Sequence, residues 1–202
     1  GGLADGRMWI EERLMDQARH RYHAVLDAGG GWTGFSSLVE DVPIAGALSE
    51  NGIDPVALFC LGPERADLDY LDHFAEDDRF LPERTMVVLN AGLVLSGRSA
   101  VGAFAAIRDT KAYKRAAAKG AVVAVMPPLA CMAEVTDRGL SFADAALGKV
   151  KAGQAPMGMF DPARVNKWWG EQIPQFFGEF PADWLLIDSS PADVAAPSAC
   201  AS

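Results

Sequence analysis

The stretch Thr85-Met86-Val87-Val88-Leu89-Asn90 decides the fold. Its apolar residues follow one another without the polar alternation of a strand that has one face in water. Such a run is typical of a strand covered on both faces, as in a parallel sheet. Similar runs predict three more strands, over Tyr22–Asp27, Val56–Leu61 and Ala121–Met126.

The segments between these runs have apolar residues at helical spacing. They predict helices over Arg7–Arg19 and Arg65–Phe74, and two helical stretches within Val101–Lys119. Strands that alternate with such helices indicate βαβ units with right-handed crossovers. The predicted fold class is therefore α/β, with a mainly parallel sheet in a three-layer α/β/α arrangement.

The chain after Met126 has a different pattern. Leu129–Arg138 and a short segment capped by Ser141 are predicted helices, and Asp161-Pro162 begins a last helix rich in aromatic residues. We expect residues 1–190 to form a single nucleotide-binding-like domain. Residues 191–202 are rich in Pro, Ala and Ser and predict a disordered tail.

The composition excludes several classes of protein. The 202 residues carry 27 acidic and 18 basic side chains, a net charge of −9, and half of them are hydrophobic. The chain is thus too apolar to be disordered, and it has no run of the ~20 apolar residues that a membrane span needs. The acidic balance disfavours nucleic-acid binding through net charge.

The cysteines and histidines indicate neither a metal cluster nor a disulfide framework. The three cysteines are far apart in the sequence, and the three histidines do not converge with them or with paired carboxylates. The first residues lack the features of a signal peptide, so we expect a cytoplasmic protein. The start without Met, at Gly1-Gly2, suggests that residues are missing before it.

Ligands of open parallel sheets bind at the carboxyl ends of the strands. The predicted strands end there in Asp27-Ala28-Gly29-Gly30, in Asn90 and in Pro127-Pro128. Asp27 is suited to hold the water shell of Mg²⁺, Gly29 and Gly30 to approach a phosphate, and Asn90 to read a purine edge. The alternatives are an ordinary turn at Asp27, a helix or turn cap at Asn90, and a strand stop at the prolines.

A basic helical face offers a second kind of site. Its residues are spaced at three and four positions along the helix: Lys111, Lys114, Arg115 and Lys119. Such a face is suited to DNA phosphates or an acidic partner, but a solvated helix surface is the favoured interpretation.

Taken together, these motifs resemble the ParA/MinD-type P-loop NTPases, most closely the conjugal-transfer and plasmid-associated branch. The resemblance covers roughly residues 20–180, and its motifs are Ala24–Gly30, Val87–Asn90, Val123–Leu129, Leu140–Ala145 and the aromatic final helix. It implies a Mg-ATP-driven switch, usually a homodimer, that acts with DNA or with a partition or transfer protein. It also implies that Asp27 is the Walker B residue, with roles in catalysis and in holding Mg²⁺, and that Pro127 and Pro128 lie on the adenine side.

One motif of that family is missing from the chain. No glycine-rich loop with Lys and Ser/Thr precedes the strand that ends at Asp27. Three hypotheses follow: an ATPase whose Walker A loop lies upstream of Gly1, a catalytically dead interaction module, and an α/β enzyme for a small acid or a dinucleotide. The last is the weakest, because Gly29-Gly30-Gly31 does not fit the dinucleotide fingerprint.

Overall fold

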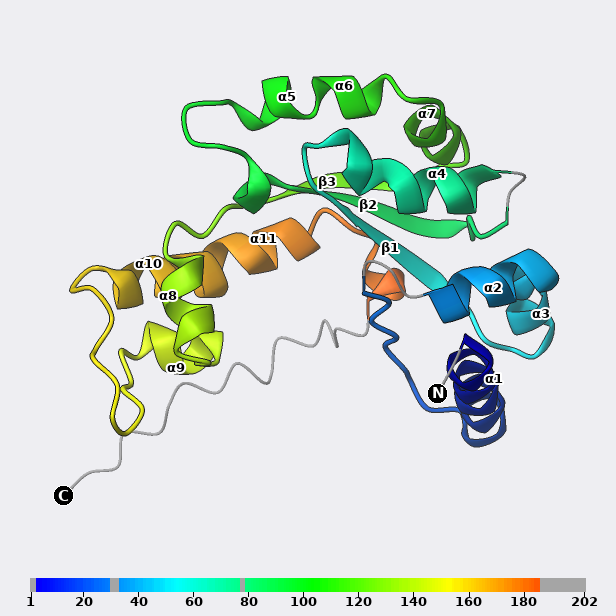
Figure 1. The fold of residues 1–202 in the computed structure, drawn as a ribbon, viewed down its shortest axis with the longest axis horizontal. Coiled ribbons are helices and arrows are strands. Elements are labelled where there is room, and N and C mark those ends of the chain that lie inside the picture. Colours follow the sequence, from blue (N-terminus) through cyan, green and yellow to red (C-terminus); the bar gives the residue numbers. More distant parts are fainter. Residues whose placement is uncertain (1–2, 30–32, 77–78, 186–202) are drawn as a thin grey trace.

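The computed structural model describes residues 3–29, 33–76 and 79–185. Its centre is a three-stranded parallel sheet in the order β1-β2-β3 (Figure 1). The strands are β1 (Val56–Leu61), β2 (Arg84–Asn90) and β3 (Val122–Met126). Three of the four predicted strands are therefore confirmed, and so is the parallel α/β class.

The fourth predicted strand is wrong. Tyr22–Asp27 belongs to no strand and follows directly on α1 (Leu3–His20). Its apolar side chains are exposed, Val25 to 87%. A continuous apolar run is typical of a buried strand, but a strand also needs a neighbouring strand that bonds its backbone N–H and C=O groups. The apolar pattern of a segment does not show whether such a neighbour exists.

The helices mostly lie where the spacing predicts them. Arg7–Arg19 lies within α1, and Arg65–Phe74 becomes a 3₁₀ turn (Arg65–Leu68) followed by α4 (Asp69–Ala75). The remaining α-helices are α2 (Thr33–Asp41), α3 (Ile44–Glu50), α5 (Ala100–Ala103), α6 (Ala105–Arg108), α7 (Lys111–Ala118), α8 (Met132–Asp137), α9 (Phe142–Ala146), α10 (Asp161–Lys167) and α11 (Ile173–Phe177). Ser141 caps α9 as predicted, since its side chain accepts a hydrogen bond from the backbone N–H of Asp144.

Helices pack on both faces of β2. On one face Val87 and Leu89 join a core with Leu71 of α4 and Ile107 of α6. On the other face Met86 and Val88 pack against Phe176 of α11 and against Phe180. Figure 1 shows α4–α7 on one side of the sheet and α11 on the other.

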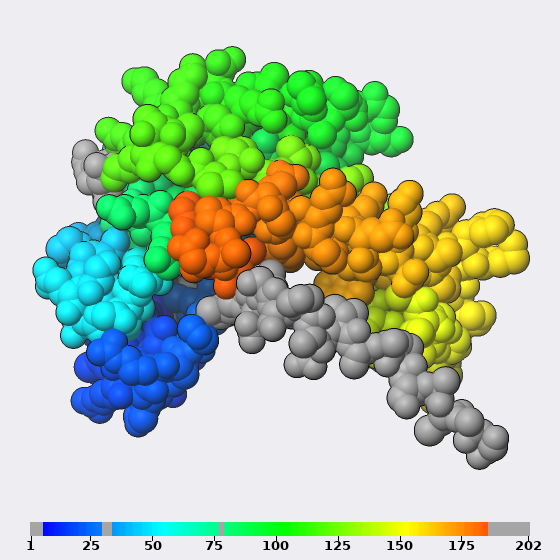
Figure 2. Space-filling model, turned by 180° about the vertical axis from the view of Figure 1, so that it is seen from behind, coloured from blue at the N-terminus to red at the C-terminus, as the bar shows by residue number. Residues whose placement is uncertain are grey.

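A second apolar cluster forms beyond β3. It contains Val135 of α8, Ala145 of α9 and Val165 of α10 around Trp168. The indole N–H of Trp168 donates to the backbone oxygen of Pro127, at 2.8 Å, so this unit is tied to the end of β3. Figure 2 shows α11, in orange, between the green helices and the yellow part of this unit.

The two faces of β1 differ. Ala57, Phe59 and Leu61 point into the main core, whereas Val56, Leu58 and Cys60 alternate with them and are exposed. β1 therefore has one packed face and one apolar face in contact with solvent.

Deletion of a core side chain in α4 tests the packing on the sheet. Leu71 is fully buried, so we expect Leu71→Ala to lower the free energy of unfolding by about 2–5 kcal/mol. The measurement is chemical denaturation followed by circular dichroism. The control is Leu95→Ala at an exposed leucine, for which a change within about 0.5 kcal/mol is expected. Equal effects of the two substitutions would contradict the core described above.

Candidate functional site

The carboxyl ends of the three parallel strands lie at one edge of the sheet. Leu61 of β1 is in register with Leu89 of β2, and Asn90 of β2 with Met126 of β3. Asn90 therefore lies beside the end of β3, where Pro127 follows. The structure thus brings together two of the predicted site residues, Asn90 and Pro127.

Asn90 has a structural role that the sequence left open. Its side-chain oxygen accepts a hydrogen bond from the backbone N–H of Gly92, at 2.9 Å, and caps the 3₁₀ turn Ala91–Leu93. A Cβ on residue 92 would lie only 3.0 Å from that oxygen, so glycine suits the turn. Within the described residues the amide nitrogen of Asn90 makes no hydrogen bond, so this donor is available to a ligand.

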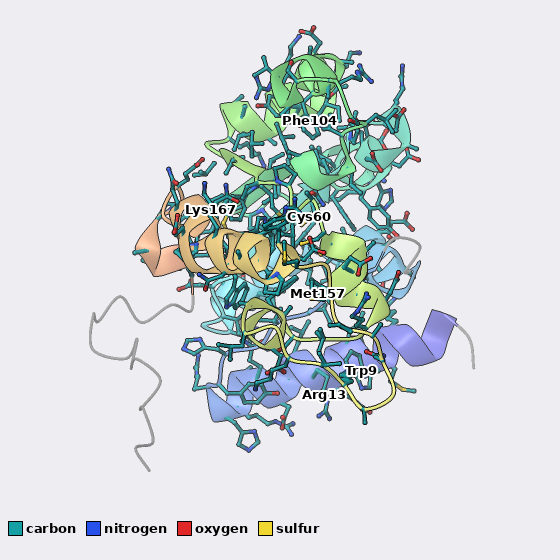
Figure 3. All side chains as sticks on the ribbon, turned by 90° about the vertical axis from the view of Figure 1, so that its left-hand side faces the viewer. Trp9, Arg13, Cys60, Phe104, Met157 and Lys167 are labelled. Carbon is teal, nitrogen blue, oxygen red and sulfur yellow. The ribbon has the colours of Figure 1, made fainter. Side chains whose placement is uncertain are left out.

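Asp27 is exposed and belongs to no strand, and its charge acts on Cys60 of β1. The surrounding chain partly removes the Cys60 thiol from water, which raises its pKa, and the negative charge of Asp27 raises this pKa further. Cys60 is the last residue but one of β1. Figure 3 shows Cys60 between Phe104 on one side and Trp9 of α1 on the other.

The predicted glycines can be followed only in part. Gly29 is exposed, and a Cβ built on it would meet no atom within 4 Å. The backbone there leaves room for a close approach by a ligand. Gly30 lies outside the described residues, as does the predicted tail at 191–202.

Pro127 and Pro128 have different surroundings. Pro127 is half-buried and lines a shallow, open hollow of about 140 Å³, whereas Pro128 is exposed. The other residues around this hollow are Val125, Gln172, Gln175, Phe176 and Glu179. Because ligand pockets typically have volumes of about 300–1,000 Å³, this hollow is too small to enclose a nucleotide.

A carboxylate that the sequence motifs missed also lies at this edge. Asp67 follows β1 by six residues and accepts a hydrogen bond from the backbone N–H of Glu64, at 2.9 Å. Its carboxylate faces Gly62 so closely that a Cβ at position 62 would collide with it. The sequence feature that could have drawn attention to Asp67 is the Glu64-x-x-Asp67 spacing, which is typical of a capping box.

The described residues contain no group of three or more His, Cys, Asp or Glu side chains that could hold a metal ion. Mg²⁺ does not need such a cluster, because it usually keeps several waters and binds through one or two carboxylates together with substrate phosphates. Asp27 as a single exposed carboxylate is compatible with that mode.

Comparisons with protein families, curated proteins and solved structures found no match for the chain. The likeness to ParA/MinD-type NTPases therefore rests on the sequence motifs alone. In the part of the chain that the structure describes, no helix is long and apolar enough to cross a membrane.

The effect of the Asp27 charge on the Cys60 pKa predicts a change in the reactivity of this thiol. Asp27→Asn removes the negative charge, so the pKa of Cys60 falls, a larger fraction of Cys60 is thiolate at pH 8, and the observed reaction rate rises. The measurement is the rate of reaction with an aromatic disulfide reagent against pH, with Cys131 and Cys200 replaced by Ala.

Asp54→Asn is the matched control, because Asp54 precedes β1 at its opposite end and is 3.8 Å from Arg84. The two variants should differ, with only Asp27→Asn shifting the pH profile downward. A profile for Asp27→Asn that coincides with that of the parent protein would contradict the placement of Asp27.

Proposed function

We propose that the chain is the sheet-bearing part of a ParA/MinD-like ATP-binding switch protein, an ATPase that acts in plasmid partitioning or conjugal transfer. The observation that carries the proposal is the position of Asn90. It ends the central strand of a parallel sheet, at the edge where such sheets bind ligands, and its amide nitrogen is available.

Each residue of the edge has a proposed role. Asp27 orients a water of the Mg²⁺ shell, and Gly29 and Gly30 contact the γ-phosphate through their backbone. Asn90 donates its amide N–H to the base, while its oxygen stays on Gly92. Pro127 and Pro128 pack beside the base. Bound Mg²⁺ would neutralise phosphate charge during hydrolysis.

The proposal includes four further features of the ParA/MinD-type NTPases. These are a three-layer P-loop-like arrangement, a homodimer, a cytoplasmic location, and DNA or a partition or transfer protein as partner. The phosphate cradle itself would come from a Walker A loop upstream of Gly1. Without that loop and its lysine, we expect this chain by itself to bind ATP only weakly.

The runner-up function is a protein-interaction module with a dead nucleotide site. Exposed apolar side chains on the unit around α8–α11 favour it, above all Met159 at 83%, Leu147 at 69% and Phe160 at 62% exposure. Exposed apolar side chains of this size can contribute to a surface that binds a partner.

Titration with a fluorescent ATP analogue and Mg²⁺ tests the main proposal in the longest natural form of the protein. We expect Asp27→Ala and Asn90→Asp each to weaken binding about tenfold or more, which corresponds to about 1.4 kcal/mol. Asn90→Asp keeps an oxygen that can accept from Gly92, but it replaces the amide donor by a negatively charged acceptor, so the thermal stability of this variant is measured beside its binding.

Matched controls are Asp109→Ala and Asn166→Ala, at exposed positions on other elements. They should bind like the parent protein. Equal nucleotide binding by the parent protein and all four variants would contradict the proposed site. A protein that shows no thermal shift at millimolar Mg-ATP would favour the interaction module, since a bound ligand stabilises the folded state.

A further inference from the structure

The hollow beside the end of β3 contains polar side chains for which the nucleotide proposal has no role. It has a volume of about 140 Å³, and the residues around it are Val125, Pro127, Gln172, Gln175, Phe176 and Glu179. The proposed function uses only Pro127 of this set. The other residues come from β3 and from the last helical segment, which lies at the surface of the molecule in Figure 2.

The polar residues of the hollow lie along one helical segment. Gln172 and Gln175 are three residues apart, so they lie on the same side of the helix. Glu179 lies in the turn that ends α11, where its backbone N–H donates to the backbone oxygen of Phe176, at 3.2 Å. The segment thus brings two amide groups and one carboxylate to the same hollow.

A π-helical turn precedes α11 and ends at the hollow. It comprises Trp168–Gln172, and Pro174 follows it. In a regular α-helix the ring of Pro174 would clash with the backbone oxygen of Gly170, and its nitrogen has no hydrogen to donate to that oxygen. A wider turn relieves this clash. Because π-helical turns are frequent at functional sites, the position of Gln172 at the end of this one draws attention to the hollow.

The three polar side chains have no partner in the part of the chain that the structure describes. The amide groups of Gln172 and Gln175 and the carboxylate of Glu179 make no hydrogen bond or ion pair there. Gln172 is half-buried, whereas Gln175 and Glu179 are exposed. The hollow therefore offers one negative charge and two amide oxygens that can accept hydrogen bonds from a ligand.

The apolar side of the hollow is held in place by packing. The ring of Phe176 meets those of Phe177 and Phe180 edge to face, with centroid distances of 5.1 and 5.2 Å. Pro127 is fixed through its backbone oxygen, which accepts the hydrogen bond from the indole of Trp168. A ligand thus meets a prearranged apolar wall beside the three acceptors.

The guanidinium group of an arginine matches this hollow in size and chemistry. A cavity of about 150 Å³ holds a benzene molecule, and a guanidinium with its adjoining methylene groups is of similar size. The guanidinium is planar, carries five N–H donors, pairs with a carboxylate through two of them and stacks on aromatic surfaces. The ammonium of lysine is a compact, strongly hydrated charge that gains less from an apolar wall.

We infer that the hollow is a docking site for an arginine side chain of a partner protein. The guanidinium pairs with Glu179 and donates to the amide oxygens of Gln172 and Gln175, while its flat face packs against Phe176 and Pro127. The net charge of −9 on the chain also attracts a basic partner. This inference does not require that the chain binds a nucleotide.

Titration of the full chain with the peptide acetyl-Gly-Arg-Gly-amide tests the inference without nucleotide. The measurement is the NMR spectrum of the isotope-labelled protein, which reports the backbone amides and the side-chain amides of the glutamines. We expect saturable shifts at Gln172, Gln175 and Glu179. The same peptide with citrulline, the uncharged analogue of arginine, or with lysine should bind about fivefold more weakly or less.

Substitution of Glu179 separates the hollow from the general charge of the chain. Glu179→Gln should weaken binding of the arginine peptide about fivefold, and Gln175→Ala should also weaken it. Glu171→Gln is the matched control, because Glu171 is an exposed acid of the same segment that does not line the hollow. This control should leave the affinity for the arginine peptide unchanged.

Three results would overturn the inference. Equal weakening by Glu179→Gln and Glu171→Gln would show that general charge attracts the peptide. Equal binding of the arginine peptide and either analogue would exclude recognition of the guanidinium. Shifts confined to other residues, or no saturable shift with peptide in the tens of millimolar, would exclude the hollow as the site.

The outcome of this test is independent of the nucleotide titration. Arginine binding that depends on Glu179, without ATP binding, would leave the docking site and contradict the proposed function. ATP binding that depends on Asp27 and Asn90, without arginine binding, would leave the function and contradict the docking site.

Discussion

The burial of β2 on both faces is the constraint on which the rest of the structure depends. Its central residues Met86–Leu89 are almost fully shielded from solvent, with two side chains directed to each face. A strand of this kind must lie in the middle of its sheet, so β1 and β3 occupy its two edges. Helices must then cover both faces, and Asn90 comes to lie where the central strand ends.

The sequence predicts the part of the fold that β2 organises. Val56–Leu61 and Ala121–Met126 become strands because β2 supplies their backbone partners, and the helices between them follow from apolar spacing. Tyr22–Asp27 has the same apolar pattern but lacks a paired neighbour. An apolar sequence indicates that burial of the segment is favourable. Whether the segment is buried as a strand depends on contacts with residues that are distant in the sequence.

Like the fold, the candidate site can be predicted from the sequence only in part. The parallel strand order places Asn90 and Pro127 at one edge, as expected from their positions at strand ends. The side-chain oxygen of Asn90 is committed to Gly92, which is the capping role that the sequence could not separate from base recognition. Asp67 escaped notice because its capping-box spacing is a local signal of a helical turn and carries no information about the sheet edge.

The central claim is that this edge binds a magnesium nucleotide between Asp27 and Asn90. Paramagnetic broadening by Mn²⁺-ATP in the NMR spectrum of the isotope-labelled protein tests it most directly. A magnesium nucleotide bound at this edge predicts selective loss of the amide signals of Asp27–Gly29 and Asn90–Gly92, with α9 at Phe142–Ala146 unaffected. Broadening confined to other parts of the chain, or none at nucleotide concentrations in the millimolar range, would contradict it.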